Sequence, residues 1–224
     1  MPKLPKLVAS VLILSGLALL TAIFTPIVAS TVRFRFFSPP KLIDPSATGR
    51  YPMPKIITAL GVTTVDYSDA SRWFTSPPTA VPVTPRSGVS FFTLSIPSIG
   101  ILNTPVEING TNLKKNAVHY PGTTLPGTVG NSVILGHSAL PGLYKKDNPL
   151  VVFNPLPQIK VGADVTVKYD GLTYRYVVKK IQEVTPSQVE VLAPTPDRYQ
   201  LTLITCVPLG TYWRRFVATA DLVN

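Results

Sequence analysis

The sequence contains a single cysteine, Cys206, in surroundings that are compatible with nucleophilic chemistry. It ends the run Thr202–Cys206 (TLITC), a loop with Pro208 and Gly210 follows, and a basic segment begins at Arg214. Because a thiol reacts as its thiolate, a reactive cysteine needs a cationic neighbour of this kind. A lone cysteine is nevertheless more often a small buried hydrophobic residue. The motif alone therefore leaves both interpretations open.

A β-hairpin would bring the cysteine and one arginine together. The strand that ends at Cys206 and the strand that starts near Arg215 are joined by a short loop, which favours antiparallel pairing. Directly opposed residues in such a pair lie roughly 5 Å apart at Cβ. Since successive side chains of a strand point to opposite faces, only one of Arg214 and Arg215 can face the thiol.

A histidine near the end of another strand could supply acid–base chemistry. His137 follows an apolar run that ends in Gly136, which predicts an imidazole at the rim of a β structure, where binding groups usually lie. The other histidine, His119, stands in a turn-rich stretch, and we expect it to be structural. One Cys and two His exclude an intramolecular disulfide, a cysteine cluster and a three-histidine metal site. No acidic cluster indicates calcium, so neither a metal ion nor a cofactor is expected.

The elements that must position these residues are short strands. From Phe91 onward, β-branched and aromatic runs alternate with turn residues, and Asp170-Gly171 predicts a two-residue hairpin. Helix is expected only as turns at Leu113–Asn116 and Ser187–Leu192. Such spacing is typical of a sandwich or a closed barrel. The expected strands are Phe91–Ile96, Thr104–Ile108, Ser132–Gly136, Asp164–Tyr169, Thr173–Val184, Tyr199–Cys206 and Arg215–Leu222.

The chain divides into three parts. Residues 7–30 carry no charge over 24 positions, and a bilayer span needs roughly 20. A cleaved secretory signal is the alternative, but its apolar core would be about 7–15 residues. We therefore expect a cytoplasmic tail and transmembrane signal-anchor at 1–35, a Pro-rich extracytoplasmic linker at 36–90, and a globular domain at 91–224.

The linker holds one apolar island. Nine of the 24 prolines lie between residues 36 and 88, a spacing that favours an extended, semi-stiff chain. Within it, Trp73 and Phe74 follow possible Asp or Ser caps, so this stretch could form one helical turn that docks on the domain and acts as a lid. The alternative is a linker with an apolar spot.

The net charge of +10 is scattered along the chain. Nucleic-acid binders usually concentrate basic residues on one face, so nucleic acid is not an expected partner. A modest attraction to anionic polymers of the cell envelope fits the same charge. Only 14% of the residues are charged and the mean hydropathy is +0.27, which excludes a disordered polyelectrolyte.

Taken together, the motifs resemble those of sortases. The segment Thr202–Cys206 matches the sortase TLxTC motif, Gly136-His137 matches the position of the catalytic histidine, and the strand that starts at Arg215 resembles the sortase arginine strand. The resemblance runs from Phe91 to Asn224 and is closest to classes D and E. It implies an eight-stranded closed β-barrel with short helices, and a membrane-anchored, single-pass cysteine transpeptidase whose catalytic domain is extracytoplasmic.

The resemblance also implies a role for each residue. Cys206 would attack the Thr–Gly bond of a Leu-Pro-x-Thr-Gly-like sorting signal and form an acyl-thioester, which an amine of a cell-wall precursor or pilin subunit would resolve. His137 would be the general acid and base. Arg215 would stabilise the oxyanion, with Arg214 as the alternative. Thr205 would help to shape the substrate pocket.

Two other functions fit parts of the sequence. An L,D-transpeptidase would place its histidine just before the cysteine, whereas 69 positions separate His137 from Cys206. A non-enzymatic, membrane-tethered β-barrel binding module would bury the cysteine, which would then react with thiol probes only after unfolding. At reference pKa values only a few per cent of a free thiol is ionised at pH 7. Either the Cys–His pair is shifted toward thiolate and imidazolium, or a minor population reacts.

Overall fold

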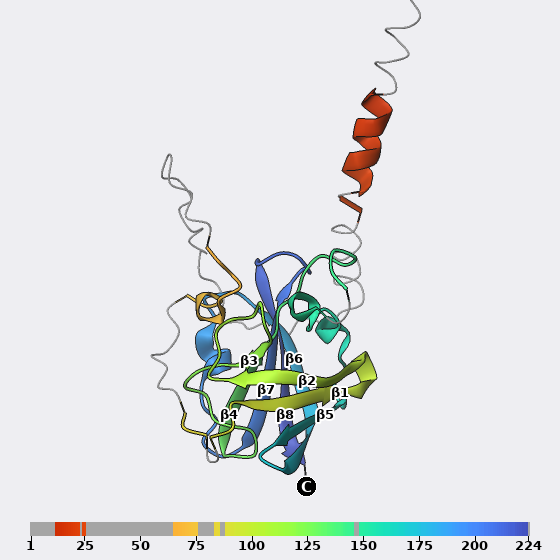
Figure 1. Ribbon diagram of the computed structural model, residues 1–224. Helices are drawn as coiled ribbons and strands as arrows, with labels where there is room; N and C mark the ends of the chain where they lie inside the picture. Colours follow the sequence, from red (N-terminus) through yellow and green to blue (C-terminus); the bar gives the residue numbers. More distant parts are fainter. Residues whose placement is uncertain are drawn as a thin grey trace, which may run out of the picture.

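The computed structural model describes residues 12–22, 24–25, 65–75, 83–85, 88–145 and 148–223. Short 3-10 turns (η) punctuate the strands (Figure 1). In chain order the elements are η1 (Ala70–Arg72), β1 (Phe91–Ile96), η2 (Pro97–Ile99), β2 (Ile101–Ile108), β3 (Ala117–His119), β4 (Gly130–Leu135), η3 (Pro149–Val151), η4 (Leu156–Gln158), β5 (Asp164–Tyr169), β6 (Leu172–Val184), η5 (Val189–Leu192), β7 (Tyr199–Val207) and β8 (Arg214–Val223).

The strands close into one barrel with the order β1-β2-β3-β4-β7-β8-β6-β5. Neighbours pair antiparallel except β2 with β3 and β4 with β7, which are parallel. The predicted all-β closed barrel with short helices is confirmed. The Asp170-Gly171 hairpin is present as well, with both residues at positive φ (52° and 74°), the conformation that a tight hairpin turn requires.

Strand β7 is buried on both faces. Its inward side chains, among them Leu201 and Leu203, belong to the core inside the barrel. Its outward side chains, Ile204 and Cys206, belong to a second apolar cluster on the outer surface. Burial of residues 201–207 follows from this position between two cores. The cysteine therefore lies at the end of a rigid strand rather than on a mobile loop.

The N-terminal part is described only in short pieces. Residues 12–22 and 24–25 are helical. Within the described residues, no helix combines the length and the apolar character that crossing a membrane demands. Much of the expected signal-anchor and most of the expected linker lie outside the described residues, so the predicted boundaries at residues 35 and 90 stay predictions.

Candidate active site

Cys206 and Arg215 are directly opposed across the β7–β8 pair. Their side chains therefore leave the sheet on the same side. Arg214 is opposite Val207 instead, and its guanidinium lies 3.1 Å from the carboxylate of Glu183. The register thus places Arg215, rather than Arg214, on the face of the thiol.

His137 lies level with Cys206 on the neighbouring strand. The backbone N–H of Gly136 donates to the carbonyl of Ile204 (3.1 Å), which continues the parallel pairing of β4 with β7 beyond β4. The Ser138 hydroxyl then donates to the carbonyl of Cys206 (2.8 Å). The three predicted residues are thus carried by the adjoining ends of β4, β7 and β8.

Packing explains why a glycine precedes His137. A Cβ on Gly136 would lie 2.3 Å from the ring of Phe153, so the aromatic ring occupies the space of the missing side chain. The backbone N–H of Phe153 donates to the carbonyl of His137 (3.1 Å). Asn154, the next residue, holds the backbone N–H and carbonyl of Ala139 through its amide. The segment that carries His137 is therefore fixed on both sides of the imidazole.

Thr205 points away from the thiol. It lies on the opposite face of β7 from Cys206, and its hydroxyl donates to the carbonyl of Gly136 (2.9 Å). In this structure the hydroxyl supports the turn before His137. The substrate-binding role predicted for Thr205 would therefore act through the backbone that it positions.

The segment of residues 65–75, which we call the cover, packs on the outer face of the barrel (Figure 1), where its Ala70, Trp73 and Phe74 share an apolar cluster with Cys206. Its turn η1 is capped by Asp69, whose carboxylate accepts from the backbone N–H of Ser71 (3.0 Å). The backbone N–H of Ala70 donates to the carbonyl of Thr111 (2.8 Å). The docked helical turn considered in the sequence is therefore present, and Trp73 is fully buried beneath it.

The cover closes the site through Arg215. The guanidinium donates from Nε (3.0 Å) and Nη2 (2.6 Å) to the carbonyl of Trp73, and it lies over the rings of Trp73 (5.4 Å) and Phe74 (5.9 Å). Cys206 belongs to the same apolar cluster as both rings and is 1% exposed. The exposed thiol expected of a catalytic cysteine is therefore absent from this state.

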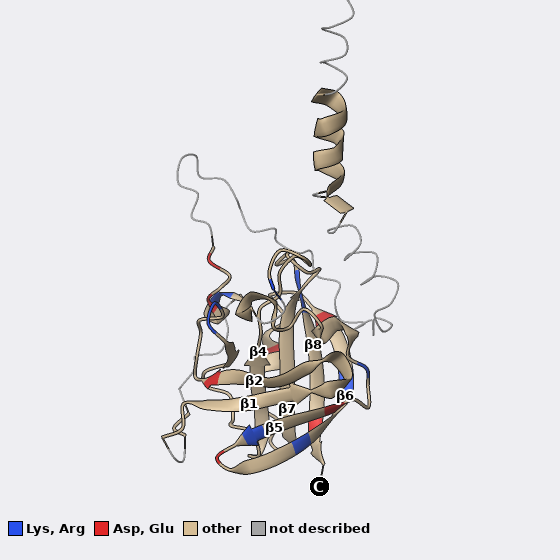
Figure 2. Ribbon diagram, turned by 45° about the vertical axis from the view of Figure 1, so that its right-hand side comes forward, with Lys and Arg blue, Asp and Glu red and all other residues tan. Residues whose placement is uncertain are grey.

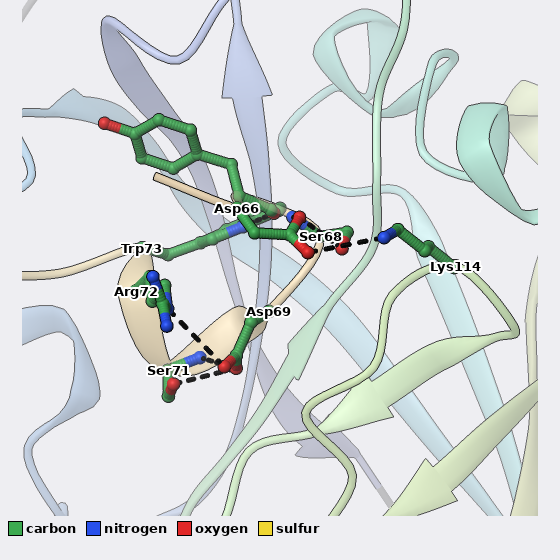
Figure 3. Close-up of polar contacts among 8 residues, drawn as sticks. Asp66, Ser68, Asp69, Ser71, Arg72, Trp73 and Lys114 are labelled. Carbon is green, nitrogen blue, oxygen red and sulfur yellow. Dashed lines mark hydrogen bonds and ion pairs between the residues drawn. The ribbon is translucent and has the colours of Figure 1, made fainter. Parts of the chain in front are cut away.

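A second set of contacts ties the cover to the loop between β7 and β8. Tyr67 stacks on Tyr212 with a centroid distance of 4.2 Å, and Tyr212 meets His137 edge-on at 6.4 Å. Asp66 forms an ion pair with Lys114 at 3.3 Å (Figure 3). A cavity of about 280 Å³ remains on this side and is lined by His137 but not by Cys206.

Comparisons with known proteins identify the fold. A family model described as the sortase domain matches residues 94–223. The chain belongs to the sortase family. Over 132 residues this sortase is 32% identical to sortase A of Streptococcus agalactiae, and the match covers 58% of the chain and 51% of that relative. The matched part thus spans about half the length of this curated relative.

Solved structures agree with this assignment. Sortase C-1 of Actinomyces oris is 32% identical, with a TM-score of 0.53 over 62% of this chain and 76% of that one. A lid mutant of sortase A from Corynebacterium diphtheriae is 28% identical, with a TM-score of 0.54 over 69% of this chain and 90% of that one.

Burial sets the protonation states in this closed sortase. It raises the pKa of the Cys206 thiol to about 11, although the charge of Arg215 acts to lower it. Burial also lowers the pKa of His137, against backbone hydrogen bonds that raise it. At pH 7 the cysteine is therefore a neutral thiol and the histidine a neutral imidazole. The closed state therefore does not hold the Cys–His pair as thiolate and imidazolium, which was the first of the two possibilities that the sequence left open.

The structure adds a support that sequence reasoning missed. Buried Asn131 accepts from the hydroxyl of Thr202 (2.7 Å), and its amide donates to the carbonyls of Val191 (3.0 Å) and Ala193 (3.1 Å). These bonds hold the β6–β7 connection against the barrel. Leu192 of this connection packs in the apolar cluster that contains Cys206. Thr202 could have indicated this contact from the sequence, because its hydroxyl needs a hydrogen-bond partner once it is buried in a strand.

Proposed function

We propose that this sortase is a cysteine transpeptidase that cleaves a Leu-Pro-x-Thr-Gly-like sorting signal between Thr and Gly and transfers the protein to an amine. One observation carries the proposal: Cys206 and Arg215 face each other in register, with His137 at the end of the adjoining strand. A nucleophile, a cation for the oxyanion and an acid–base group are the parts that acyl transfer requires.

The first half-reaction starts from the neutral pair. His137 accepts the thiol proton as Cys206 Sγ bonds to the Thr carbonyl carbon of the signal. The guanidinium of Arg215 stabilises the developing oxyanion. The C–N bond then breaks, the imidazolium gives its proton to the leaving Gly amine, and an acyl-thioester remains on Cys206.

The second half-reaction returns the enzyme to its starting state. An acceptor amine from a cell-wall precursor or a pilin subunit bonds to the thioester carbonyl carbon, and His137 takes the proton that the nitrogen loses. The C–S bond breaks and Cys206 leaves as thiolate, which recovers a proton from the imidazolium. A new amide bond replaces the one that was cleaved. This sequence needs neither a metal ion nor an oxidant.

The cover must move before this chemistry can begin. The carbonyl of Trp73 occupies the N–H groups of Arg215 that the oxyanion would use. Since one similar solved structure is described as a lid mutant, the proposal extends to the cover as a lid in this chain. The displaced Trp73 and Phe74 would uncover an apolar face that an extended peptide could occupy.

The proposal places the enzyme at the cell membrane. The uncharged residues 7–30 would form the signal-anchor, and the barrel would lie outside the cytoplasm, where sorting-signal proteins and amine acceptors meet it. This placement rests on the apolar segment and on the resemblance to anchored sortases.

The test is turnover of a quenched sorting peptide by the full chain in detergent, with and without an amine acceptor. We expect fluorescence release and a ligated product, and hydroxylamine should trap the acyl group as a hydroxamate. Cys206→Ala and His137→Ala should abolish both signals. Arg215→Gln should reduce kcat by roughly 100-fold or more, while the matched Arg214→Gln keeps most of the activity.

A non-enzymatic, membrane-tethered binding module remains the second candidate, because the thiol is buried and protonated. The two functions differ in thiol reactivity. A catalytic Cys206 should be alkylated in the folded protein and protected by the sorting peptide. If alkylation occurs only after unfolding and no hydroxamate forms, the binding module is the correct assignment.

A further inference from the structure

The loops around the site expose a set of apolar and aromatic side chains that catalysis does not use. Trp213 is 69% exposed and Leu143 62%, with Tyr144 beside the latter. Tyr212 stacks inward on the cover, whereas Trp213, the next residue, is not part of the lining of the cavity beside His137. Because most of the Trp213 side chain is exposed, we look for its role in a contact with another molecule.

These side chains lie at one end of the barrel. Leu143, Tyr144 and Tyr212 line the same cavity, which joins the 140–145 loop to the β7–β8 loop. Both loops lie at the end opposite the C-terminus in Figure 1. The cover also lies toward this end of the barrel. We call Leu143, Tyr144 and Trp213 the rim.

Two lysines lie near the rim. Lys145 follows Tyr144, and Lys115 shares with Tyr144 the lining of a neighbouring cavity of about 590 Å³. Neither lysine forms an ion pair within the described part of the chain. Figure 2 shows Lys and Arg on the loops at this end. Protein surfaces that lie in the headgroup region of a membrane typically expose Trp, Tyr and Leu side chains next to lysines.

We propose that the rim rests on the surface of an anionic bilayer, with Trp213 and Leu143 in the headgroup region. The inference rests on the anchoring part of the proposed function, since residues 7–30 would bring the domain to a bilayer. The 34 residues between that segment and Val65 span up to about 110 Å when extended, so the anchor alone does not orient the barrel. The rim supplies an orientation, and it would keep the site next to a membrane-bound substrate or acceptor.

Trp213 is its own probe for the test. The chain has two tryptophans, and Trp73 is fully buried. Quenching from the bilayer or from water should therefore report mainly on Trp213. The full chain would be reconstituted into vesicles of phosphatidylcholine and phosphatidylglycerol, with or without bromine-labelled acyl chains. We expect the brominated lipids to quench at least about half of the Trp213 emission and to protect it from aqueous acrylamide.

A probe at the other end of the barrel is the matched control. Leu172 is exposed in the β5–β6 hairpin, near the strand end of β6 that pairs with the C-terminal end of β8. In the double variant Trp213→Phe with Leu172→Trp, the emission should be quenched by acrylamide and not by brominated lipid. Trp213→Phe alone should lose the lipid-quenched component.

The opposite results overturn the proposal. If Trp213 in vesicles stays open to acrylamide and unquenched by brominated lipid, or if the residue 172 probe is quenched equally, the barrel has no preferred face toward the bilayer. A chain that fails to associate with vesicles contradicts the proposal as well. Peptide turnover in detergent is measured separately and should be unchanged by Trp213→Phe, so failure of this inference is distinguishable from failure of the proposed transpeptidation.

Discussion

Arg215 is a buried cation. Among the described residues, no carboxylate forms a hydrogen bond or an ion pair with its guanidinium. Its guanidinium donates to the carbonyls of Trp73, Tyr212 and Arg214 and lies over two aromatic rings. A buried charge is tolerated only when its donors are satisfied, and backbone dipoles together with ring faces do so here. The carbonyl of Trp73 therefore stands where a substrate oxygen would be in the proposed reaction.

His119, the second histidine, makes the domain sensitive to acid. Its Nε2 is hydrogen-bonded to the carbonyl of Thr124 (2.9 Å), and burial lowers its pKa from 6.5 to about 4. The unfolded chain therefore binds more protons than the native one between these values, and stability is lost as pH falls from about 6.5 toward 4. The full contribution is roughly 3 kcal/mol.

We therefore expect urea unfolding of the full chain in detergent to show a lower free energy of unfolding at pH 5 than at pH 7. His119→Gln, which keeps a polar group of similar reach and cannot titrate, should flatten that difference. His137 also has a lowered pKa, so it too makes the free energy of unfolding fall with decreasing pH. The contribution of His119 is therefore the pH dependence of the unfolding free energy in the wild type minus that in the variant. Equal slopes would show that His119 does not titrate in this way.

At the scale of elements, the site depends on β4 and β7 ending together. The side chains of Ser138 and Thr205 each bond to a backbone carbonyl of the other segment. Gly136 lets Phe153 pack against the same turn. These contacts hold the segment of the imidazole in place relative to the strand of the thiol.

Gly136→Ala should break this arrangement. The new methyl group would collide with the Phe153 ring, and overpacking of this kind lowers the free energy of unfolding by about 1–3 kcal/mol. Peptide turnover should fall as well, because the displaced turn carries His137. Adding Phe153→Leu should recover part of the loss, which a double-mutant cycle would measure as coupling. Strictly additive losses would mean that the two residues do not interact as described.

Several elements could be predicted because their determinants are local. The Cys206–Arg215 pairing follows from one short hairpin, and the turn at Asp170-Gly171 from its two residues. Strand β3 could not be found in this way. It has only three residues, all of them buried, so no alternation of exposed and buried side chains marks it as a strand that pairs with β2 and β4.

At the scale of the whole molecule, the closed state was not predictable from any local pattern. Arg215 and Trp73 are 142 positions apart. The sequence allowed a helical turn with Trp73 and Phe74 to dock on the domain as a lid, but alternation along β7 cannot show that this turn covers its outer face. Burial raises the pKa of the thiol, and the rings of Trp73 and Phe74 in the cover belong to the apolar cluster that buries it.

This packing gives a prediction for the double variant Trp73→Ala, Phe74→Ala. Each buried aromatic side chain contributes roughly 1.5–3 kcal/mol through burial, so their loss should favour the open cover by a large factor. We expect iodoacetamide to alkylate Cys206 at least about tenfold faster at pH 7. The pH midpoint of alkylation should also move down from about 11, because burial is relieved while Arg215 remains opposite the thiol.

Global unfolding would also expose the thiol, so the control must separate the two routes. Leu172→Ala removes an exposed side chain far from the site and should leave the alkylation rate unchanged. The free energy of unfolding from urea titration gives the fraction of globally unfolded molecules, and hence the alkylation rate expected if only these react. For the double variant, alkylation in native buffer should be faster than this rate. A rate that only follows global stability, or an unshifted pH midpoint, would show that the cover does not control access to Cys206. A faster rate with a lower midpoint would locate the control of reactivity in residues 65–75, outside the barrel that carries the reacting groups.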